Sequence, residues 1–179
     1  MKKFIGDLLK EPIVRFLLIG FFLYLSWLAL YEWWIHPMEW VDKAVIDNTL
    51  LISQKILTRL GYETALNGSR MIFVKGTRGL FLGDSCNGIS LFALYSIFLI
   101  SFPGKIISKM IFIPLGIIAI HLLNVFRIVC LCIIETHSFE WTEFNHTYTF
   151  TIFIYAFIFG VWLLWINKFS SFKKSSVHA

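Results

Sequence analysis

The residue best suited to covalent chemistry is Cys86, which lies in the stretch Gly83-Asp84-Ser85-Cys86-Asn87-Gly88-Ile89. A polar segment ends there and a long apolar one begins, so we expect the cysteine to start a helix at a membrane edge. The free N–H groups and positive dipole end of a helix start stabilise a thiolate, the nucleophilic form of cysteine. Asn87 can hydrogen-bond locally, and Gly88 lets a substrate backbone come close. The structural alternative is a small buried side chain.

Two further polar residues are predicted at the same depth. Arg127 lies within an apolar run, about seven residues or roughly 10 Å from its outer end. Such an arginine faces an interior or aqueous site, unless its side chain extends to the lipid headgroups. Asn124, one turn earlier, could orient the guanidinium, and His146 begins the last apolar run on the same side. Three separately placed residues at one level predict an active site.

These residue types fit acyl transfer. A cysteine attacks a carbonyl to give a thioester, and a histidine can take the thiol proton and later activate the incoming nucleophile. An arginine can stabilise the thiolate or the developing oxyanion. An amine acceptor makes the reaction transpeptidation and water makes it proteolysis, and the residues alone do not choose between them.

Composition predicts one integral membrane domain over residues 1–179. The chain is 58% hydrophobic and 15% charged, well away from a soluble domain. The odd number of cysteines argues against a disulfide framework, and Cys130 and Cys132 are interpreted as packing residues. The predicted fold is all-α, with about four transmembrane helices of about 20 residues each. They are expected at about 13–31, 84–102, 110–134 and 147–166.

Charge distribution predicts the orientation. Lysine and arginine concentrate before the first span, between the second and third, and after the fourth. By the positive-inside rule both termini are cytoplasmic and the site faces outward from the cell inner membrane. The first span reads as an uncleaved helix and the tail 170–179 as disordered. Trp33, Trp34, Trp40 and Trp141 suit membrane interfaces.

The outer segment 32–83 should contain two elements. Apolar residues recur at helical spacing over 45–60, which predicts an amphipathic helix lying either on the membrane surface or over the top of the bundle. Met71–Val74 and the residues 79–82 flank Lys75-Gly76-Thr77-Arg78, a pattern typical of a small β-hairpin leading into Cys86. No nucleotide-binding loop or zinc-finger spacing occurs, so we expect no nucleic acid partner, no cofactor and no metal.

The chain resembles the exosortase/archaeosortase family of membrane-embedded, sortase-like transpeptidases. The resemblance lies in Asp84-Ser85-Cys86-Asn87-Gly88-Ile89, Asn124-Val125-Phe126-Arg127-Ile128 and Asn145-His146, and it covers roughly residues 70–166. The family pattern is Cys-x-Gly at a helix start, Asn-x-x-Arg in a later helix, and histidine at the start of the next. The resemblance implies that Cys86 is the nucleophile and that Arg127 and His146 complete a catalytic triad, with Asp84, Asn87, Gly88 and Asn124 in support.

The resemblance also implies the partners. Family substrates are exported proteins with a C-terminal signal made of a short motif, one membrane helix and a basic cluster. The enzyme cuts at the motif on the outer face and passes the product to a surface acceptor, which would be a membrane lipid or a surface glycan. Asp84 replaces a common glutamate, and Asn87 a common serine or threonine. Many relatives have more helices, so the chain is similar to the short exosortase F-type proteins of Bacteroidetes, and a small membrane subunit could complete its substrate groove.

Two other functions compete. A metal-dependent membrane hydrolase would use His137, Glu140, Glu143 and His146, although one narrow helix face does not hold all four and no HExxH is present. A non-catalytic assembly factor or small transporter would use Arg127 to bind an anionic lipid or solute. In that case Cys86→Ser keeps function and Arg127→Ala does not.

Overall fold

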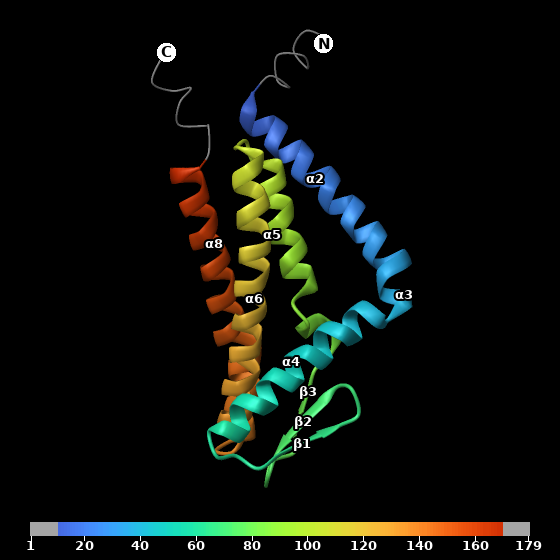
Figure 1. Cartoon of the computed structure of the whole chain (residues 1–179), viewed down its shortest axis with the longest axis vertical. Coiled ribbons are helices and arrows are strands. Elements are labelled where there is room, and N and C mark those ends of the chain that lie inside the picture. Colours follow the sequence, from blue (N-terminus) through green and yellow to red (C-terminus); the bar gives the residue numbers. More distant parts are fainter. Residues whose placement is uncertain (1–10, 170–179) are drawn as a thin grey trace.

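The computed structural model describes residues 11–169. The two long helical stretches nearest the C-terminus run side by side along the molecule, and the first long helix slants away from them (Figure 1). The basic residues Lys2, Lys3 and Lys10 and the predicted disordered tail 170–179 lie outside the described residues. Three helical stretches are long and apolar enough to cross a membrane: Pro12–Met38, Ile106–Glu135 and Phe139–Lys168. They indicate an integral membrane protein.

Two of these stretches contain wider π-helical turns. The first consists of α2 (Pro12–Leu30), the turn Tyr31–Ile35 and α3 (His36–Met38). The third consists of α7 (Phe139–Phe144), the turn Asn145–Thr149 and α8 (Phe150–Lys168). The second is the single helix α6 (Ile106–Glu135). The predicted spans 13–31, 110–134 and 147–166 each fall within one of them, and all three helices extend further than predicted.

The prediction of one continuous helix over 84–102 is wrong. Asp84–Cys86 form a 3₁₀ turn, and α5 runs only over Ile89–Ser101, which is 13 residues. At about 1.5 Å per residue it is about 20 Å long, whereas a hydrocarbon core is about 30 Å thick. Gly88 interrupts the helix because its φ of +86° lies in the left-handed region. A fourth span is therefore not established by helix length.

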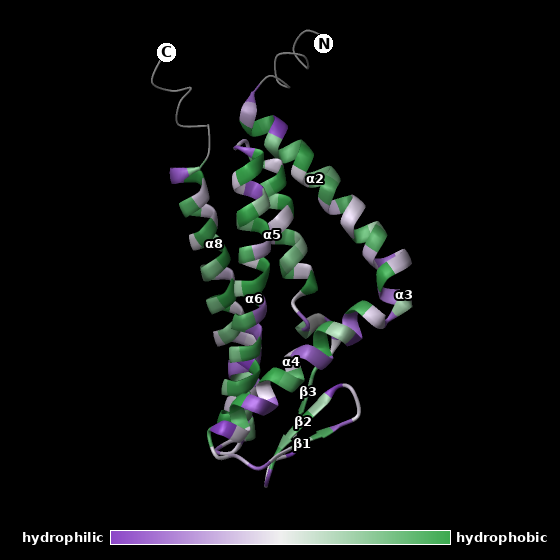
Figure 2. Ribbon diagram, in the orientation of Figure 1, coloured by the Kyte–Doolittle hydropathy of each residue, from purple (hydrophilic) through white to green (hydrophobic). Residues whose placement is uncertain are grey.

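The outward faces of the long helices are apolar, and hydrophilic residues gather on α4 and at helix ends (Figure 2). Phe22 on α2 and Ile152 on α8 are 63% and 68% exposed. Side chains of this size left uncovered along whole helices fit contact with lipid. The predicted interfacial tryptophans are also exposed: Trp33, Trp34, Trp40 and Trp141.

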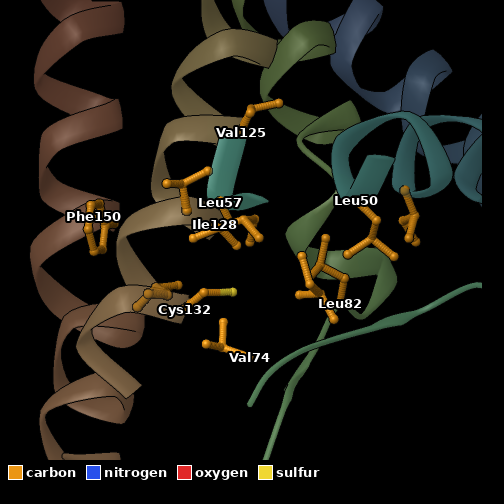
Figure 3. Packing of buried hydrophobic residues seen from close by; sticks show 12 residues of the cluster. Leu50, Leu57, Val74, Leu82, Val125, Ile128, Cys132 and Phe150 are labelled. Atoms are coloured by element: carbon orange, nitrogen blue, oxygen red, sulfur yellow. The ribbon is translucent and has the colours of Figure 1, made fainter. Parts of the chain in front are cut away.

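The helix α4 (Trp40–Arg59) crosses the lower half of α6 (Figure 1). It is the predicted amphipathic helix, and it packs over the bundle, the second of the two alternatives. Figure 3 shows Leu50 and Leu57 of α4 beside Val125, Ile128 and Cys132 of α6 in one buried cluster. The half-buried Cys130 packs against the same cluster, so both cysteines act as packing residues there.

A small antiparallel sheet packs against one side of this cluster. The strands are β1 (Thr64–Asn67), β2 (Met71–Val74) and β3 (Leu80–Phe81), in the order β1-β2-β3. Ile72 opposite Leu80 fixes the register of the predicted hairpin, which is confirmed. The strand β1 was not predicted. Because β3 leads directly into the 3₁₀ turn, the sheet fixes the position of the turn that carries Cys86.

A second buried cluster holds α5, α6 and α8 together. Tyr95 and Trp165 are 1% and 0% exposed within it. Gly116 of α6 lets α5 approach closely, because a Cβ added there would lie 2.1 Å from the ring of Tyr95. The Tyr95 hydroxyl donates to the Phe112 carbonyl oxygen at 2.8 Å. This cluster fixes α5, and with it the Cys86 turn, against the other two helices.

Candidate functional site

Cys86 is held at the end of the 3₁₀ turn by its own backbone. Its N–H donates to the Gly83 carbonyl oxygen at 2.9 Å. Its carbonyl oxygen accepts a hydrogen bond from Asn124 Nδ2 of α6 at 3.0 Å. Asn124, which we expected to orient the Arg127 guanidinium, thus contacts the backbone of Cys86. The thiol itself is half-buried.

Asn87 and Gly88 form the start of α5. Asn87 is 1% exposed, and its Oδ1 accepts a hydrogen bond from the Ile89 N–H at 2.9 Å. The side chain, one residue before the N-cap Gly88, therefore satisfies the first backbone N–H of α5. A Cβ added to Gly88 would face Phe92 and Asn124 at ordinary contact distances. The positive φ, rather than close approach of a substrate, is the visible reason for glycine here.

Arg127 reaches the cysteine from α6. It is 8% exposed, so the alternative in which its side chain extends to the headgroups is wrong. Its Nη2 donates to Cys86 Sγ at 3.8 Å. Its Nε has no hydrogen-bond partner within residues 11–169 although it is buried. A guanidinium with an unused donor beside a thiol can bind a negative charge that forms there.

His146 reaches the same sulfur from the other side. It lies in the π-helical turn Asn145–Thr149, and its Nε2 is 3.4 Å from Cys86 Sγ. In the tautomer whose proton is on Nδ1, Nε2 can accept the thiol proton, and when Nε2 carries a proton it can donate to the sulfur. The three residues predicted at one depth, Cys86, Arg127 and His146, are therefore brought together from three separate elements.

The three side chains line one pocket of about 360 Å³. Cys86, Ser90 and Leu91 come from the α5 side, Arg127 from α6, and the others from the last helical stretch. The remaining lining residues are Thr147, Thr151, Ile154 and Tyr155.

Asp84 connects the 3₁₀ turn to the sheet. Its Oδ1 accepts a hydrogen bond from Arg70 Nη1 at 2.6 Å, and both side chains are 30% exposed. This hydrogen bond raises the pKa of Arg70, which keeps the arginine charged. Nearby, Arg78 lies over the Phe139 ring at 4.8 Å and connects the β2–β3 turn to α7. The turn carrying Cys86 is thus connected to the sheet by these contacts.

The residues of the competing metal site do not converge. Within the described part of the chain, no group of three or more His, Cys, Asp or Glu side chains could hold one metal ion. His137 Nδ1 instead contacts the Ile133 carbonyl oxygen at 3.2 Å and Thr136 Oγ1 at 3.0 Å. His146 is the member of that set that reaches the pocket.

One residue of the site was missed by sequence reasoning. Asp42, in the first turn of α4, is 1% exposed, and its Oδ1 accepts hydrogen bonds from Tyr31 and from Asn87. A lone acid in the first turn of an amphipathic helix is usually a solvated residue that favours the helix dipole. Its partner Asn87 lies more than forty residues away in the sequence, so the pattern of residues around Asp42 does not predict its burial.

Comparison of the chain with family models, with curated proteins and with solved structures finds no match. The resemblance described above therefore rests on the residues quoted for it, and the function is argued from the geometry of the site.

Proposed function

We propose that this protein is a membrane-embedded cysteine transpeptidase or protease that acts on exported proteins. One observation supports it above all others. Cys86 Sγ has His146 Nε2 at 3.4 Å and Arg127 Nη2 at 3.8 Å, and all three residues line one pocket. A nucleophile, a base and an anion-stabilising donor are the parts that acyl transfer requires.

All three residues take part in each half-reaction. His146 takes the proton of the Cys86 thiol, and the sulfur attacks the carbonyl carbon of the scissile peptide. Arg127 stabilises the resulting oxyanion with donors that lie beside the sulfur. Arginine cannot serve as the base, because its guanidinium stays protonated. The C–N bond then breaks, the leaving amine takes the proton from His146, and a Cys86 thioester remains.

The second half-reaction reverses the first. An amine, hydroxyl or water molecule enters the pocket and gives a proton to His146 as it attacks the thioester carbon. The C–S bond breaks, and the Cys86 sulfur recovers its proton. An amine or hydroxyl acceptor gives a transferred product, and water gives a cleaved one. Hydroxyl groups of Ser90, Thr147 and Thr151 line the approach and can hydrogen-bond a peptide backbone.

We place the site on the outer side of a four-crossing topology, with α5 as the short crossing. The start of α2, the α5–α6 connection and the end of α8 lie at one end of the molecule (Figure 1). In the sequence, the segments that belong to that end carry nine bases and two acids, whereas the rest of the chain carries seven bases and nine acids. This balance makes that end cytoplasmic by the positive-inside rule. The opposite end, with α4 and the sheet, then faces outward in the cell inner membrane.

The substrates and acceptors follow from the resemblance. An exported protein with a C-terminal membrane helix would present its motif to Cys86 at the outer side. The acceptor would be a membrane lipid or a surface glycan. A small membrane subunit is a further expected partner, because the chain is compact.

The test is detection of the thioester. The protein is purified from its native membranes, and the peptide containing Cys86 is examined by mass spectrometry before and after neutral hydroxylamine, which cleaves thioesters. We expect a hydroxylamine-sensitive acyl adduct on Cys86 that is retained in Cys130→Ala. His146→Ala should carry less of this adduct, because His146 takes the thiol proton when the thioester forms. Absence of the adduct in wild type would refute the proposal.

One observation favours a second function. The Nε of Arg127 is buried without a partner in the described residues, which suits permanent binding of an anionic lipid or solute. In that non-catalytic assembly factor or transporter, Cys86→Ser keeps cellular function whereas Arg127→Ala abolishes it. Loss of function in both variants favours the enzyme.

A further inference from the structure

A buried carboxylate contacts the residue that follows Cys86 in the chain. Asp42 is 1% exposed, and its Oδ1 accepts hydrogen bonds from the Tyr31 hydroxyl at 2.8 Å and from Asn87 Nδ2. Its Oδ2 lies 3.6 Å from His36 Nδ1, a charge contact that makes no hydrogen bond within the described residues. These partners come from the end of the first membrane stretch and from the turn before α5. Because burying a carboxylate is costly unless it is well paired, this cluster is a specific device rather than a solvated surface.

The carboxylate fixes the orientation of one amide. A carboxylate group can only accept hydrogen bonds, so it selects the NH₂ side of Asn87. The Oδ1 of Asn87 is thereby directed to the Ile89 N–H at 2.9 Å. If the amide turned over, its oxygen would face Asp42 and its NH₂ would face the Ile89 N–H. Both contacts would then be repulsive.

The orientation of Asn87 controls the residue before it. Cys86 is bonded to Asn87, and its carbonyl oxygen is held by Asn124 at 3.0 Å. The peptide between the two residues is therefore fixed from α6 on one side and, through Asp42, from α4 on the other. The Cys86 sulfur, 3.4 Å from His146 and 3.8 Å from Arg127, depends on both anchors.

We propose that Asp42 is a positioning residue for Cys86 and acts through the Asn87 amide. The inference rests on the proposed function, because it gives Asp42 a role in setting up that nucleophile. Loss of the carboxylate frees the amide, loosens the start of α5 and turns the thiol away from His146 and Arg127. A positioning role depends on which side chain donates in the hydrogen bond between residues 42 and 87. Exchanging the two side chains reverses donor and acceptor.

The experiment is an exchange of the two side chains in the full-length protein in lipid nanodiscs. Asn87→Asp alone sets two carboxylates against each other. The double variant Asp42→Asn/Asn87→Asp restores one donor and one acceptor, and Tyr31 can still pair because a hydroxyl both donates and accepts. The carboxylate introduced at position 87 also keeps an oxygen for the Ile89 N–H. Asp42→Ala removes the anchor, and Asp47→Ala on the same helix is the matched control.

The readout is the rate at which iodoacetamide alkylates Cys86, followed by mass spectrometry of its peptide from pH 5.5 to 9.5. We expect Asp42→Ala and Asn87→Asp each to slow alkylation at neutral pH by about tenfold, the effect of one well-placed hydrogen bond. The double variant should recover most of the rate, and Asp47→Ala should match wild type. Recovery by exchange is not expected of a residue that only contributes stability.

Two outcomes overturn the inference. One is a wild-type rate in folded Asp42→Ala or Asn87→Asp, and the other is a double variant as slow as Asn87→Asp. If Asp42→Ala does not fold, the comparison of Asn87→Asp with the double variant decides alone. Alkylation requires no peptide substrate, so this result is independent of the thioester test. A recovered rate without any Cys86 adduct would keep the positioning role and reject the transpeptidase.

Discussion

The charge of Arg127 should control how readily Cys86 ionises. With Nη2 3.8 Å from Sγ, the guanidinium and a thiolate attract each other by about 1 kcal/mol at the dielectric constant of water and about 4 kcal/mol at an effective value of about 20. One pH unit corresponds to about 1.4 kcal/mol, so Arg127→Met should raise the pH midpoint of Cys86 alkylation by about 1–3 units. Methionine keeps the length of the side chain and removes only its charge and donors.

The assay is alkylation by a membrane-impermeant reagent in right-side-out vesicles, with the rate measured at each pH. The pH midpoint of each variant is compared with that of wild type. Arg127→Lys keeps the charge on a shorter group and should give an intermediate midpoint. Arg59→Met, at the exposed end of α4, controls for the loss of one positive charge.

Two results would refute this reasoning. A midpoint in Arg127→Met within about 0.3 pH units of wild type would mean that the charge does not act on the thiol, because the weakest attraction above already predicts more. An equal displacement in Arg59→Met would mean that the whole protein field, not the contact, sets the midpoint. Loss of labelling in wild type vesicles would contradict the outward orientation.

Three further predictions follow from the described contacts. His146→Ala should slow turnover of a Cys86 thioester by about 10²–10⁴-fold, the usual contribution of a general base, and a pulse–chase rate equal to wild type would contradict it. Gly88→Ala should lower stability by about 1–2 kcal/mol because its φ is +86°, seen as a lower thermal midpoint in detergent, whereas Gly160→Ala, which meets nothing within 4 Å, should not. Gly116→Ala should cost about 1–3 kcal/mol by overpacking against Tyr95, and a double variant with Tyr95→Ala should lose less than the two single losses combined.

Parts of the fold could be predicted because they depend on local patterns. The apolar runs gave three of the long helices, since length and hydropathy suffice to identify a spanning segment. The hairpin was found from the turn residues 75–78 between two apolar stretches. The convergence of Cys86, Arg127 and His146 was predictable because topology alone assigns each one a depth.

The remaining features depend on contacts between distant residues. The helix α5 starts late because its N-cap, Gly88, takes a positive φ and Asn87 binds the first N–H of the helix, whereas hydropathy rises earlier. The burial of Asp42 depends on Tyr31 and Asn87, which come from other segments. The strand β1 forms only because β2 provides its partner. None of these interactions leaves a periodic signal in its own stretch of sequence.

The short length of α5 has a consequence for the surrounding bilayer. If α5 crosses the membrane as proposed, its 13 residues leave a hydrophobic mismatch of about 10 Å against a hydrocarbon core of about 30 Å. Lipid next to its outer end must thin, or water and protein must fill the difference. Cys86 would then lie at the bottom of a depression in the outer leaflet, within reach of a peptide still anchored by its own membrane helix. Bilayers of shorter-chain lipids would relieve this mismatch, so the alkylation rate of Cys86 should depend on lipid chain length.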